Sequence, residues 1–471
     1  MKKKLLSLLL VSTMVLSLAA CGKDKATEET TTNDTAATET EVTAAPEATE
    51  TGFPTIDSLV LGESYTDITA DLKFLTHRSD IVDTKLAGYV TEFQKMYPNI
   101  NITYEAATDY REDIIIRLTT SDWGDICMIP TTVQKSECPN YFVSYGDHDT
   151  IGQTYGYIDN FSYDNQVYGI ASTVNAQGVL YNKRIFAEAG ITVLPTTPEE
   201  FIADLQLIKD NTDAVPLYTN FAAGWTMGAW DAYIGGSATG DPDYNNYTLV
   251  HAANPFADRG DSTGPFAVYN TLYQAVANGL IEDDPTTTDW ESSKAKLNSG
   301  EIATMVLGSW AVTQMQAAGS TPEDVGYIPF PITVDGTVYA SAGPDYCYGI
   351  NVNSSEDNQI ASMLYVKYLT EMSNFAYSEG GIPIVLGAEY PDVLAAFADA
   401  TLVIDTSAPV GDETLLDDLK SASEVGINQE NTHVQRIVEA ALDGTETMEE
   451  IAADWNEKWS AGQESLGIEV K

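Results

Sequence analysis

The chain has 471 residues, which is long enough for two domains that each bury a core of their own. Its 70 Asp and Glu residues far outnumber its 23 Lys and Arg residues, and the formal net charge is −47. Such an acidic surface repels phosphate backbones and anionic headgroups, and the sequence has no basic face with interleaved aromatic residues. The composition therefore argues against nucleic acid as a partner and against docking on an anionic membrane surface.

The first residues predict an export signal that ends in a lipidation site. A lysine cluster at positions 2–4 precedes the apolar run 5–18, and two alanines come directly before Cys21. These are the parts of a secretory signal, and the run is too short to span a bilayer. The tetrad Leu-Ala-Ala-Cys at 18–21 resembles the bacterial lipobox, which implies that residues 1–20 are removed and that Cys21 is lipidated. An ordinary cleaved signal with a chance cysteine is the alternative.

The segment after Cys21 predicts a flexible tether. Residues 22–52 are mostly Thr, Glu and Ala, with almost no large apolar side chain. Such a segment cannot bury enough surface to offset the entropy of ordering. As a random coil, about 40 residues reach roughly 30–40 Å, enough to hold a folded body away from a membrane. We therefore assign 21–58 to the lipidated cysteine and an acidic tether.

The remaining cysteines and the histidines predict neither a disulfide framework nor a metal site. Cys127, Cys138 and Cys347 are an odd number and cannot all pair internally. A bridge between Cys127 and Cys138 is one alternative, and buried free thiols are the other. The four histidines stand singly, without CxxC or HExxH spacing, so we expect no metal and no cofactor.

The first part of the folded body alternates strands with helices. The predicted elements are a strand at 72–75, a helix at 86–96, a strand at 100–104, a helix near 114–118 and a strand at 126–129. This order indicates a parallel sheet and an α/β architecture. In such sheets, loops that leave the carboxyl ends of strands are the usual ligand sites.

The later elements continue this pattern and end in helices. They are a strand at 178–181, a helix at 201–208, a strand at 303–307, an unassigned segment at 327–330, a strand at 348–352, a helix at 363–369 and two C-terminal helices separated by Asp443–Gly444. The acidic run Glu282–Asp284 could suggest a glycosidase pair, but adjacent carboxylates point apart and do not flank a bond. We expect it to be a solvated loop.

Four separated segments carry a family resemblance. The first is Glu-Phe-Gln-Lys-Met-Tyr-Pro-Asn-Ile at 92–100, and the second is 164–201, which begins Asp-Asn-Gln-Val-Tyr-Gly-Ile and ends Thr-Pro-Glu-Glu-Phe. The third is 297–350, which contains Leu-Asn-Ser-Gly-Glu-Ile-Ala-Thr-Met and then Gly-Ser-Trp. The fourth is Glu-Gly-Gly-Ile-Pro at 379–383, together with the closing helices around 440–444. In this order they resemble the extracellular solute-binding proteins of ABC-type sugar importers, the family that includes maltose-binding protein.

The resemblance implies a two-lobe α/β fold, in which each lobe is a mostly parallel sheet flanked by helices. Crossover strands join the lobes, the ligand lies in the cleft between them, and a hinge motion closes the cleft. The first lobe would comprise 66–174 and 344–387, and the second 175–343 and 388–471.

The function implied is that of a lipid-anchored extracellular receptor. It would capture a carbohydrate, with an oligosaccharide expected, and deliver it to an ABC permease on the outer face of the cytoplasmic membrane, as a monomer without enzymatic activity. The sequence has no phosphate-binding loop and no Gly-x-Ser-x-Gly elbow. The alternatives are an exported glycan-cleaving lipoprotein, and the same fold with a peptide, polyamine or metal complex as its cargo.

Sugars present C–H ring faces and a rim of hydroxyls, so a site needs flat aromatic rings and short polar groups. By resemblance, Trp310 stacks on sugar and Asn175 binds hydroxyls, and core packing is the alternative for Trp310. One of Trp225 and Trp230 is expected to be a second stacking platform. Trp225 is preferred, since Trp230 fits a core position at the start of a helix.

Polar candidates follow the first strand. Arg78 and Asp80 could fork onto vicinal hydroxyls, and a solvated turn with Asp80 near a helix start is the alternative. Tyr346 precedes a strand and is expected to close over the ligand, whereas Asp125 is expected to be structural. The weaker candidates are Tyr377, Glu379 and Asn431.

Overall fold

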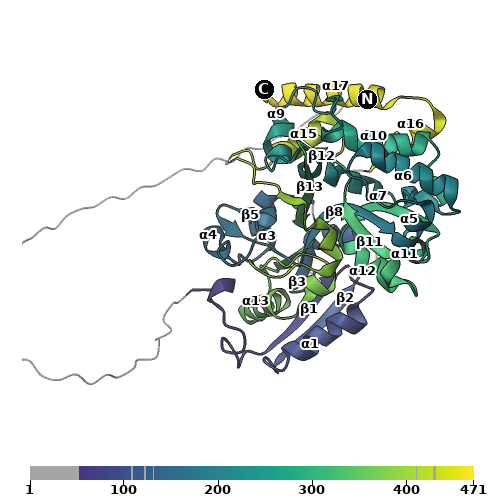
Figure 1. Ribbon diagram of the computed structural model, residues 1–471. Helices are drawn as coiled ribbons and strands as arrows, with labels where there is room; N and C mark the ends of the chain where they lie inside the picture. Colours follow the sequence, from purple (N-terminus) through teal and green to yellow (C-terminus); the bar gives the residue numbers. More distant parts are fainter. Residues whose placement is uncertain (1–51, 108–109, 121–122, 131, 410, 428–430) are drawn as a thin grey trace, which may run out of the picture. The chain divides into compact units, whose positions relative to one another are not determined.

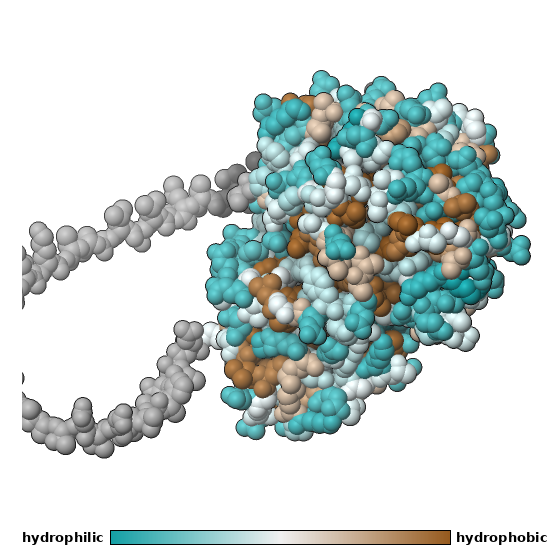
Figure 2. All heavy atoms as spheres, in the orientation of Figure 1, coloured by the Kyte–Doolittle hydropathy of each residue, from teal (hydrophilic) through white to brown (hydrophobic). Residues whose placement is uncertain are grey.

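The computed structural model describes residues 52–107, 110–120, 123–130, 132–409, 411–427 and 431–471. The signal, Cys21 and most of the tether lie outside the described residues. The folded unit runs from Phe53 to Lys471, so the tether predicted at 21–58 extends too far: Ile56 is buried, and its N–H donates to the Tyr145 carbonyl at 2.8 Å. In the described ranges, every helix is too short or too polar to cross a bilayer. Figure 2 shows a largely hydrophilic surface on the face drawn, with hydrophobic residues in separate patches.

The first sheet has the strand order β2-β1-β3-β14-β7. Its strands are β1 (Ala70–Thr76), β2 (Ile100–Ala106), β3 (Ile126–Ile129), β7 (Ile170–Ala171) and β14 (Cys347–Ile350). The strands β2 and β3 run parallel to β1, as the sequence predicts, whereas β14 runs antiparallel to both of its neighbours. Because β14 is antiparallel to β3, the residues before β14 lie at the carboxyl ends of β1 and β3.

Helices and a small sheet surround the first sheet. The helices are α1 (Ala87–Phe93), α2 (Tyr110–Leu118), α3 (Cys138–Tyr141), α4 (His148–Ile151), α13 (Glu356–Glu371) and α14 (Phe375–Ser378), and the small sheet is β4 (Gly146–Asp147), β6 (Gln166–Val167) and β5 (Ser162–Tyr163). The helix α13 lies against β1 (Figure 1), with the Tyr365 ring 6.4 Å from Phe74 and 4.9 Å from Phe93 between centroids. These aromatic contacts join the helical layer to the sheet.

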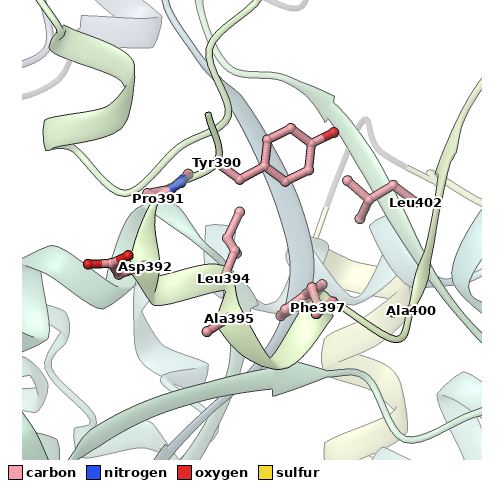
Figure 3. Close-up of a pocket in the computed structure, with 9 residues that line it drawn as sticks. Tyr390, Pro391, Asp392, Leu394, Ala395, Phe397, Ala400 and Leu402 are labelled. Carbon is pink, nitrogen blue, oxygen red and sulfur yellow. The ribbon is translucent and has the colours of Figure 1, made fainter. Parts of the chain in front are cut away.

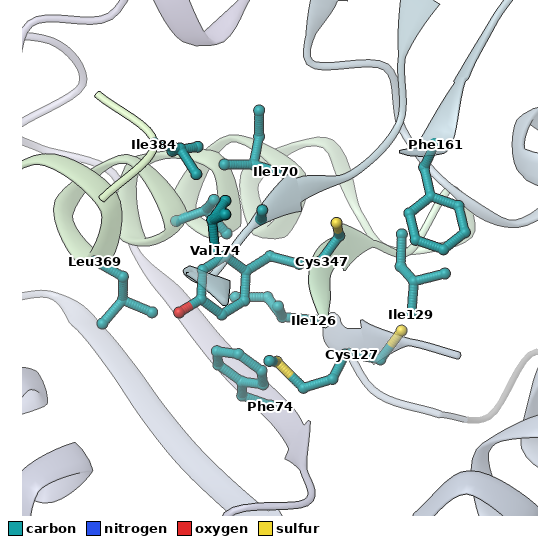
Figure 4. Close-up of a cluster of buried hydrophobic side chains, with 14 of the residues drawn as sticks. Phe74, Ile126, Cys127, Ile129, Phe161, Ile170, Val174, Cys347, Leu369 and Ile384 are labelled. Atoms are coloured by element: carbon teal, nitrogen blue, oxygen red, sulfur yellow. The ribbon is translucent and has the colours of Figure 1, made fainter. Parts of the chain in front are cut away.

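The three cysteines described are free and buried. Cys127 on β3 and Cys347 on β14 lie in the core that Figure 4 shows, beside Phe74 and Ile129. Cys138 is buried at the start of α3. Of the two alternatives left by the sequence, the structure therefore has the buried thiols and not the Cys127–Cys138 bridge.

The second sheet has the order β12-β13-β8-β10-β9, with β11 beside β8 and β15 beside β13. Its strands are β8 (Val174–Asn182), β9 (Val215–Leu217), β10 (Ile302–Gly308), β11 (Val325–Pro329), β12 (Thr333–Val334), β13 (Thr337–Pro344) and β15 (Thr401–Ile404). The β9–β10 and β13–β15 pairs are parallel, the β12–β13 pair is antiparallel, and β8 is antiparallel to its three partners.

The two-lobe α/β class is confirmed, but the prediction of mostly parallel sheets is wrong in detail, since both sheets are mixed. The prediction extended a strand–helix alternation to the whole chain. It failed because β8 and β14 each enter a sheet directly from a chain crossing and not from a crossover helix, so their direction is not constrained by the strand before them.

The longer helices of the second lobe are α5 (Lys183–Ala189), α6 (Pro198–Asn211), α10 (Gly264–Ala277), α11 (Trp290–Ser299), α12 (Trp310–Ala317), α15 (Leu415–Ser423), α16 (Thr432–Asp443) and α17 (Met448–Leu466). The short ones are α7 (Trp225–Gly228), α8 (Gly236–Thr239) and α9 (Leu249–His251). Gly444 ends α16 with a φ of +62°, a left-handed conformation that favours glycine. This confirms the predicted break between the last two helices, whose Trp455 and Trp459 are buried.

The chain crosses between the two sheets in three segments that are hydrogen-bonded side by side. Val174 and Ile382 exchange backbone hydrogen bonds of 2.9 and 2.8 Å. Next to them, Ser172 N donates to the carbonyl of Tyr346 at 3.0 Å, and Asp345 N donates to that of Thr173 at 2.9 Å. The exact lobe boundaries stay a prediction.

Asp125 connects β3 to its neighbours. Its Oδ2 accepts a hydrogen bond from Lys73 N at 2.9 Å, and its Oδ1 accepts from Ser354 Oγ at 2.7 Å and from Asn358 Nδ2 at 2.9 Å. The side chain therefore joins β1, β3 and the start of α13, which is the structural role that the sequence predicts.

Replacing Asp125 with alanine should destabilise the fold. Asp125→Ala removes the acceptor of three part-buried hydrogen bonds, so we expect the free energy of unfolding to fall by about 2–3 kcal/mol in urea titrations. The exposed Asp71 accepts one side-chain hydrogen bond, from Asn101, and Asp71→Ala is the matched control, expected to change stability by less than about 0.5 kcal/mol. Equal losses in the two variants would contradict this role for Asp125.

Candidate functional site

Three tryptophans from separate parts of the chain form one aromatic cluster. The ring centroids lie 5.2 Å apart for Trp225 and Trp290, 5.6 Å for Trp290 and Trp310, and 5.7 Å for Trp225 and Trp310. Trp225 keeps 41% of its surface exposed, while the other two are half-buried against the core. The cluster presents flat apolar ring surface next to solvent, as sugar-binding sites require.

The topology explains why these rings meet. The strands β9 and β10 are parallel, and a parallel bridge places Ile281 beside Leu217 on the other side of β9. Three adjacent stretches thus run the same way and end at one edge of the sheet. The first α-helix after each stretch begins with a tryptophan. Side chains at that position lean toward the start of the helix, and here this brings the three rings together.

Trp225 and Trp310 were predicted from the sequence, whereas Trp290 was not. The local sequence marked only the helix start, because Asp289 precedes Trp290 as an N-cap residue whose Oδ1 accepts from Ser292 N at 2.8 Å. Trp230, the other candidate, is only 2% exposed and packs edge-on against Phe330 at 5.9 Å. Its burial therefore favours the alternative that the sequence left open, a core residue.

Asn175 lies beside the turn that carries Trp310. Ser309 Oγ donates to Asn175 Oδ1 at 3.4 Å and accepts from Ala176 N at 3.1 Å, and Ser309 N donates to the Ala176 carbonyl at 2.9 Å. These contacts fix the start of α12 to β8. Asn175 is itself buried, so its predicted contact with sugar hydroxyls stays a prediction.

A second group of candidates lies after β1 and is charged. Arg78 bonds to both oxygens of Asp80 at 2.9 Å and to Glu379 at 2.5 Å, and Lys85 bonds to the other oxygen of Glu379 at 2.5 Å. Burial alone would raise the pKa of the Asp80 carboxyl, but the hydrogen bond from Arg78 holds that pKa below its usual value. Arg78 and Asp80 are thus bonded to each other, and their predicted contact with ligand stays a prediction.

Glu379 is the buried centre of this charged group, with 8% of its side chain exposed. Glu379 was a weaker candidate from the sequence, and Lys85 was not predicted. Glu379 also meets the tryptophan side, because Thr313 Oγ1 on α12 donates to its carbonyl oxygen at 3.2 Å. Thr313 is three residues after Trp310, and so lies on the same face of α12. One helix therefore connects the aromatic cluster to the charged group.

The Tyr346 and His77 rings complete the edge of the first sheet. Their centroids lie 4.5 Å apart, and the Tyr110 ring stands edge-on to Tyr346 at 5.8 Å. The His77 Nδ1 atom is buried and has no hydrogen-bond partner among the described residues. Burial lowers the pKa of His77 to about 4, so the imidazole is neutral at neutral pH. The predicted closure of Tyr346 over a ligand stays a prediction.

A separate pocket of about 550 Å³ lies at η10 (Asp392–Phe397) and β15. Figure 3 shows Tyr390, Leu394 and Leu402 around it. Its lining is mostly apolar, with polar groups on Asp392 and Tyr390, and it includes none of the predicted site residues. Within the part of the chain that the structure describes, no group of three His, Cys, Asp or Glu residues could hold a metal ion.

Comparisons with known proteins agree on one family. The family described as bacterial extracellular solute-binding protein matches residues 80–374. The multiple sugar-binding protein of Streptococcus mutans is 22% identical over 305 residues, which are 61% of this chain and 68% of that protein.

Two solved structures from Bifidobacterium animalis subsp. lactis resemble the chain more strongly. One is a manno-oligosaccharide-specific solute-binding protein with mannotriose, 47% identical, with a TM-score of 0.85, over 88% of this chain and 99% of that chain. The other is a binding protein of an ABC transporter with mannobiose, 48% identical, with a TM-score of 0.84, over 88% and 99%.

The lowered pKa of His77 predicts a specific pH dependence of stability. An unfolded histidine titrates near pH 6.5, so between about pH 4 and 6.5 the unfolded chain binds more protons at this position than the folded one. The free energy of unfolding should therefore fall as the pH drops through this window, with up to about 3 kcal/mol due to His77. Urea titrations of the wild type and of His77→Phe at several pH values test this. The variant should show a flatter dependence, and parallel curves would contradict the assignment.

Proposed function

Because the chain belongs to the family of bacterial extracellular solute-binding proteins, we propose that it captures a carbohydrate outside the cell and delivers it to the permease of an ABC transporter. The observation that carries this proposal is the cluster of Trp225, Trp290 and Trp310, which presents ring surface beside polar groups. Flat aromatic rings match the C–H faces of sugars, and nearby polar side chains match their hydroxyls.

The carbohydrate we propose is a manno-oligosaccharide. The mannotriose-bound and mannobiose-bound relatives share close to half of their residues with this chain over nearly their whole length, which supports a common ligand class. An oligosaccharide also suits the site, since three tryptophans offer more ring surface than one sugar unit covers.

Capture would proceed by closure of the two lobes on the ligand. The tryptophan cluster belongs to the second lobe and the Arg78 group to the first, with the hydrogen-bonded crossing segments between them. A ligand that contacts both groups binds the closed state better and shifts the population toward it. This mechanism needs no covalent step, and we propose that the protein is not an enzyme.

The anchor would be the lipidated Cys21. Together with the acidic tether it would hold the receptor, as a monomer, on the outer face of the cytoplasmic membrane. A tether of roughly 30–40 Å keeps the receptor near its permease at a high effective concentration. We propose the lobes as 66–174 with 344–387 and 175–343 with 388–471.

The proposal predicts that loss of a ring in the cluster weakens sugar binding. We expect mannotriose to bind the wild type in isothermal titration calorimetry, and Trp310→Ala to weaken that affinity by at least about tenfold, since the variant loses the apolar surface that the sugar covers. Tyr163→Ala removes an exposed aromatic ring outside the cluster and is the matched control, with unchanged affinity expected.

Three results would contradict the proposal. Chromatography that shows cleavage of mannotriose would favour the glycan-cleaving enzyme. Absence of binding by the wild type to any oligosaccharide, with binding of peptides or polyamines, would favour a different cargo. Equal affinity in Trp310→Ala and in the wild type would remove the cluster from the site.

The anchor has its own test. Cys21→Ala removes the thiol that would carry lipid, so we expect the variant protein in the culture medium, while the wild type sediments with the membrane fraction. Mass spectrometry of the mature wild type should show a lipid-modified N-terminal cysteine. Wild-type protein in the medium with an unmodified Cys21 would contradict the anchor.

A further inference from the structure

The acidic residue Glu282 lies beside the loop that leads to Trp225. The ladder between the two segments begins as a normal parallel pairing, with Leu217 N donating to the carbonyl of Leu280 at 3.0 Å. Two residues later, Thr219 N donates at 2.9 Å to the side-chain Oε2 of Glu282, and the Thr219 hydroxyl donates to Oε1. A carboxylate thus takes the place of the next backbone acceptor.

Glu282 is not the solvated residue that its acidic run predicted. Only 9% of it is exposed, and burial raises the pKa of its carboxyl even though the hydrogen bonds from Thr219 act in the opposite direction. A buried carboxylate is costly unless hydrogen bonds compensate for the lost water. Here both oxygens of Glu282 accept hydrogen bonds from one residue, Thr219. The next residue, Asp283, is exposed as expected.

Further contacts join the same two segments as far as the tryptophans. Ala222 N donates to Thr288 Oγ1 at 2.8 Å, and Asp289 N donates to the Tyr218 hydroxyl at 3.1 Å. The pairing ends where the rings of Trp225 and Trp290 meet edge to face. The segment 282–290 therefore braces the segment 218–225 along its length.

The braced loop has a conformation that it would not favour alone. Asn220 has a φ of +56°, in the left-handed region, although asparagine tolerates this region better than most residues. Its carbonyl accepts from Thr226 Oγ1 at 2.8 Å, and the Thr219 hydroxyl accepts from Phe221 N at 3.2 Å. Such local strain persists only when surrounding contacts enforce it.

We propose that Glu282 is a positioning residue for the carbohydrate site: its carboxylate fixes the start of the Trp225 loop, and so sets the position of Trp225 against Trp290 and Trp310. The proposal rests on the proposed function. Without the carboxylate, Thr219 loses both acceptors and the loop loses the contact nearest the sheet, while the core below it stays intact. Trp225, as the most exposed ring of the three, is the one free to move.

Three variants test the proposal. Glu282→Ala removes both acceptors. Glu282→Gln keeps an oxygen for Thr219 N and places an NH₂ against the Thr219 hydroxyl, which can accept it, so it is the rescue variant. Asp283→Ala removes a carboxylate from the neighbouring exposed position and is the matched control.

Two readouts are needed, and the first does not involve sugar. Near-UV circular dichroism and acrylamide quenching report on the packing of the tryptophan cluster. We expect an altered spectrum and greater quenching for Glu282→Ala, with Glu282→Gln and Asp283→Ala close to the wild type. The second readout is calorimetry with mannotriose, in which Glu282→Ala should bind about tenfold more weakly and the other two within about twofold of the wild type.

The outcomes separate this proposal from the proposed function. If the wild type does not bind mannotriose, the proposed manno-oligosaccharide specificity fails, and the spectra still decide whether Glu282 positions the cluster. If Glu282→Ala folds with an unchanged spectrum and unchanged affinity, the positioning role is overturned. If Glu282→Ala does not fold, Glu282→Asp, which keeps the charge but draws the carboxylate one methylene back from Thr219, takes its place and should give an altered spectrum. An unchanged spectrum in Glu282→Asp would overturn the role as well.

Discussion

The backbone pairing where the chain crosses between its two sheets is the constraint on which the rest of the structure depends. The crossing segments have buried N–H and C=O groups that need partners, and they find them in one another, as in the exchange between Val174 and Ile382. This pairing brings β8, β13 and the segment before β14 side by side. It thereby places the edges of both sheets, with Tyr346 on one and Trp310 on the other, next to the same crossing.

The candidate site is a consequence of that arrangement and of the direction of the strands. Parallel stretches of the second sheet deliver three tryptophans to one edge, each at the first residue of a helix. At the first sheet, β1 delivers Arg78 to the same crossing. Glu379, which belongs to a crossing segment, then binds Arg78 through its carboxylate and Thr313 through its carbonyl. Movement of one lobe would therefore shift residues in both the tryptophan cluster and the charged group around Arg78.

The sequence predicted what depends on local pattern. The strand at 126–129 and the break at Gly444 follow from hydrophobic spacing and turn chemistry, and both are found as predicted. What depends on long-range pairing could not be predicted in this way. Three features depend on which segments lie side by side: the direction of β8, the burial of Glu282, and the contact of Trp290 with Trp225 and Trp310. An acidic run beside a helix start does not indicate locally which segment it will pair with.

A crystal structure of the protein with mannotriose is the measurement that tests the central claim most directly. The account predicts a mannose ring stacked on Trp225 or Trp310, with hydroxyls within hydrogen-bonding distance of residues from the first lobe. Mannotriose seated elsewhere, such as in the apolar pocket at η10 and β15, with the tryptophan cluster free of sugar, would contradict it.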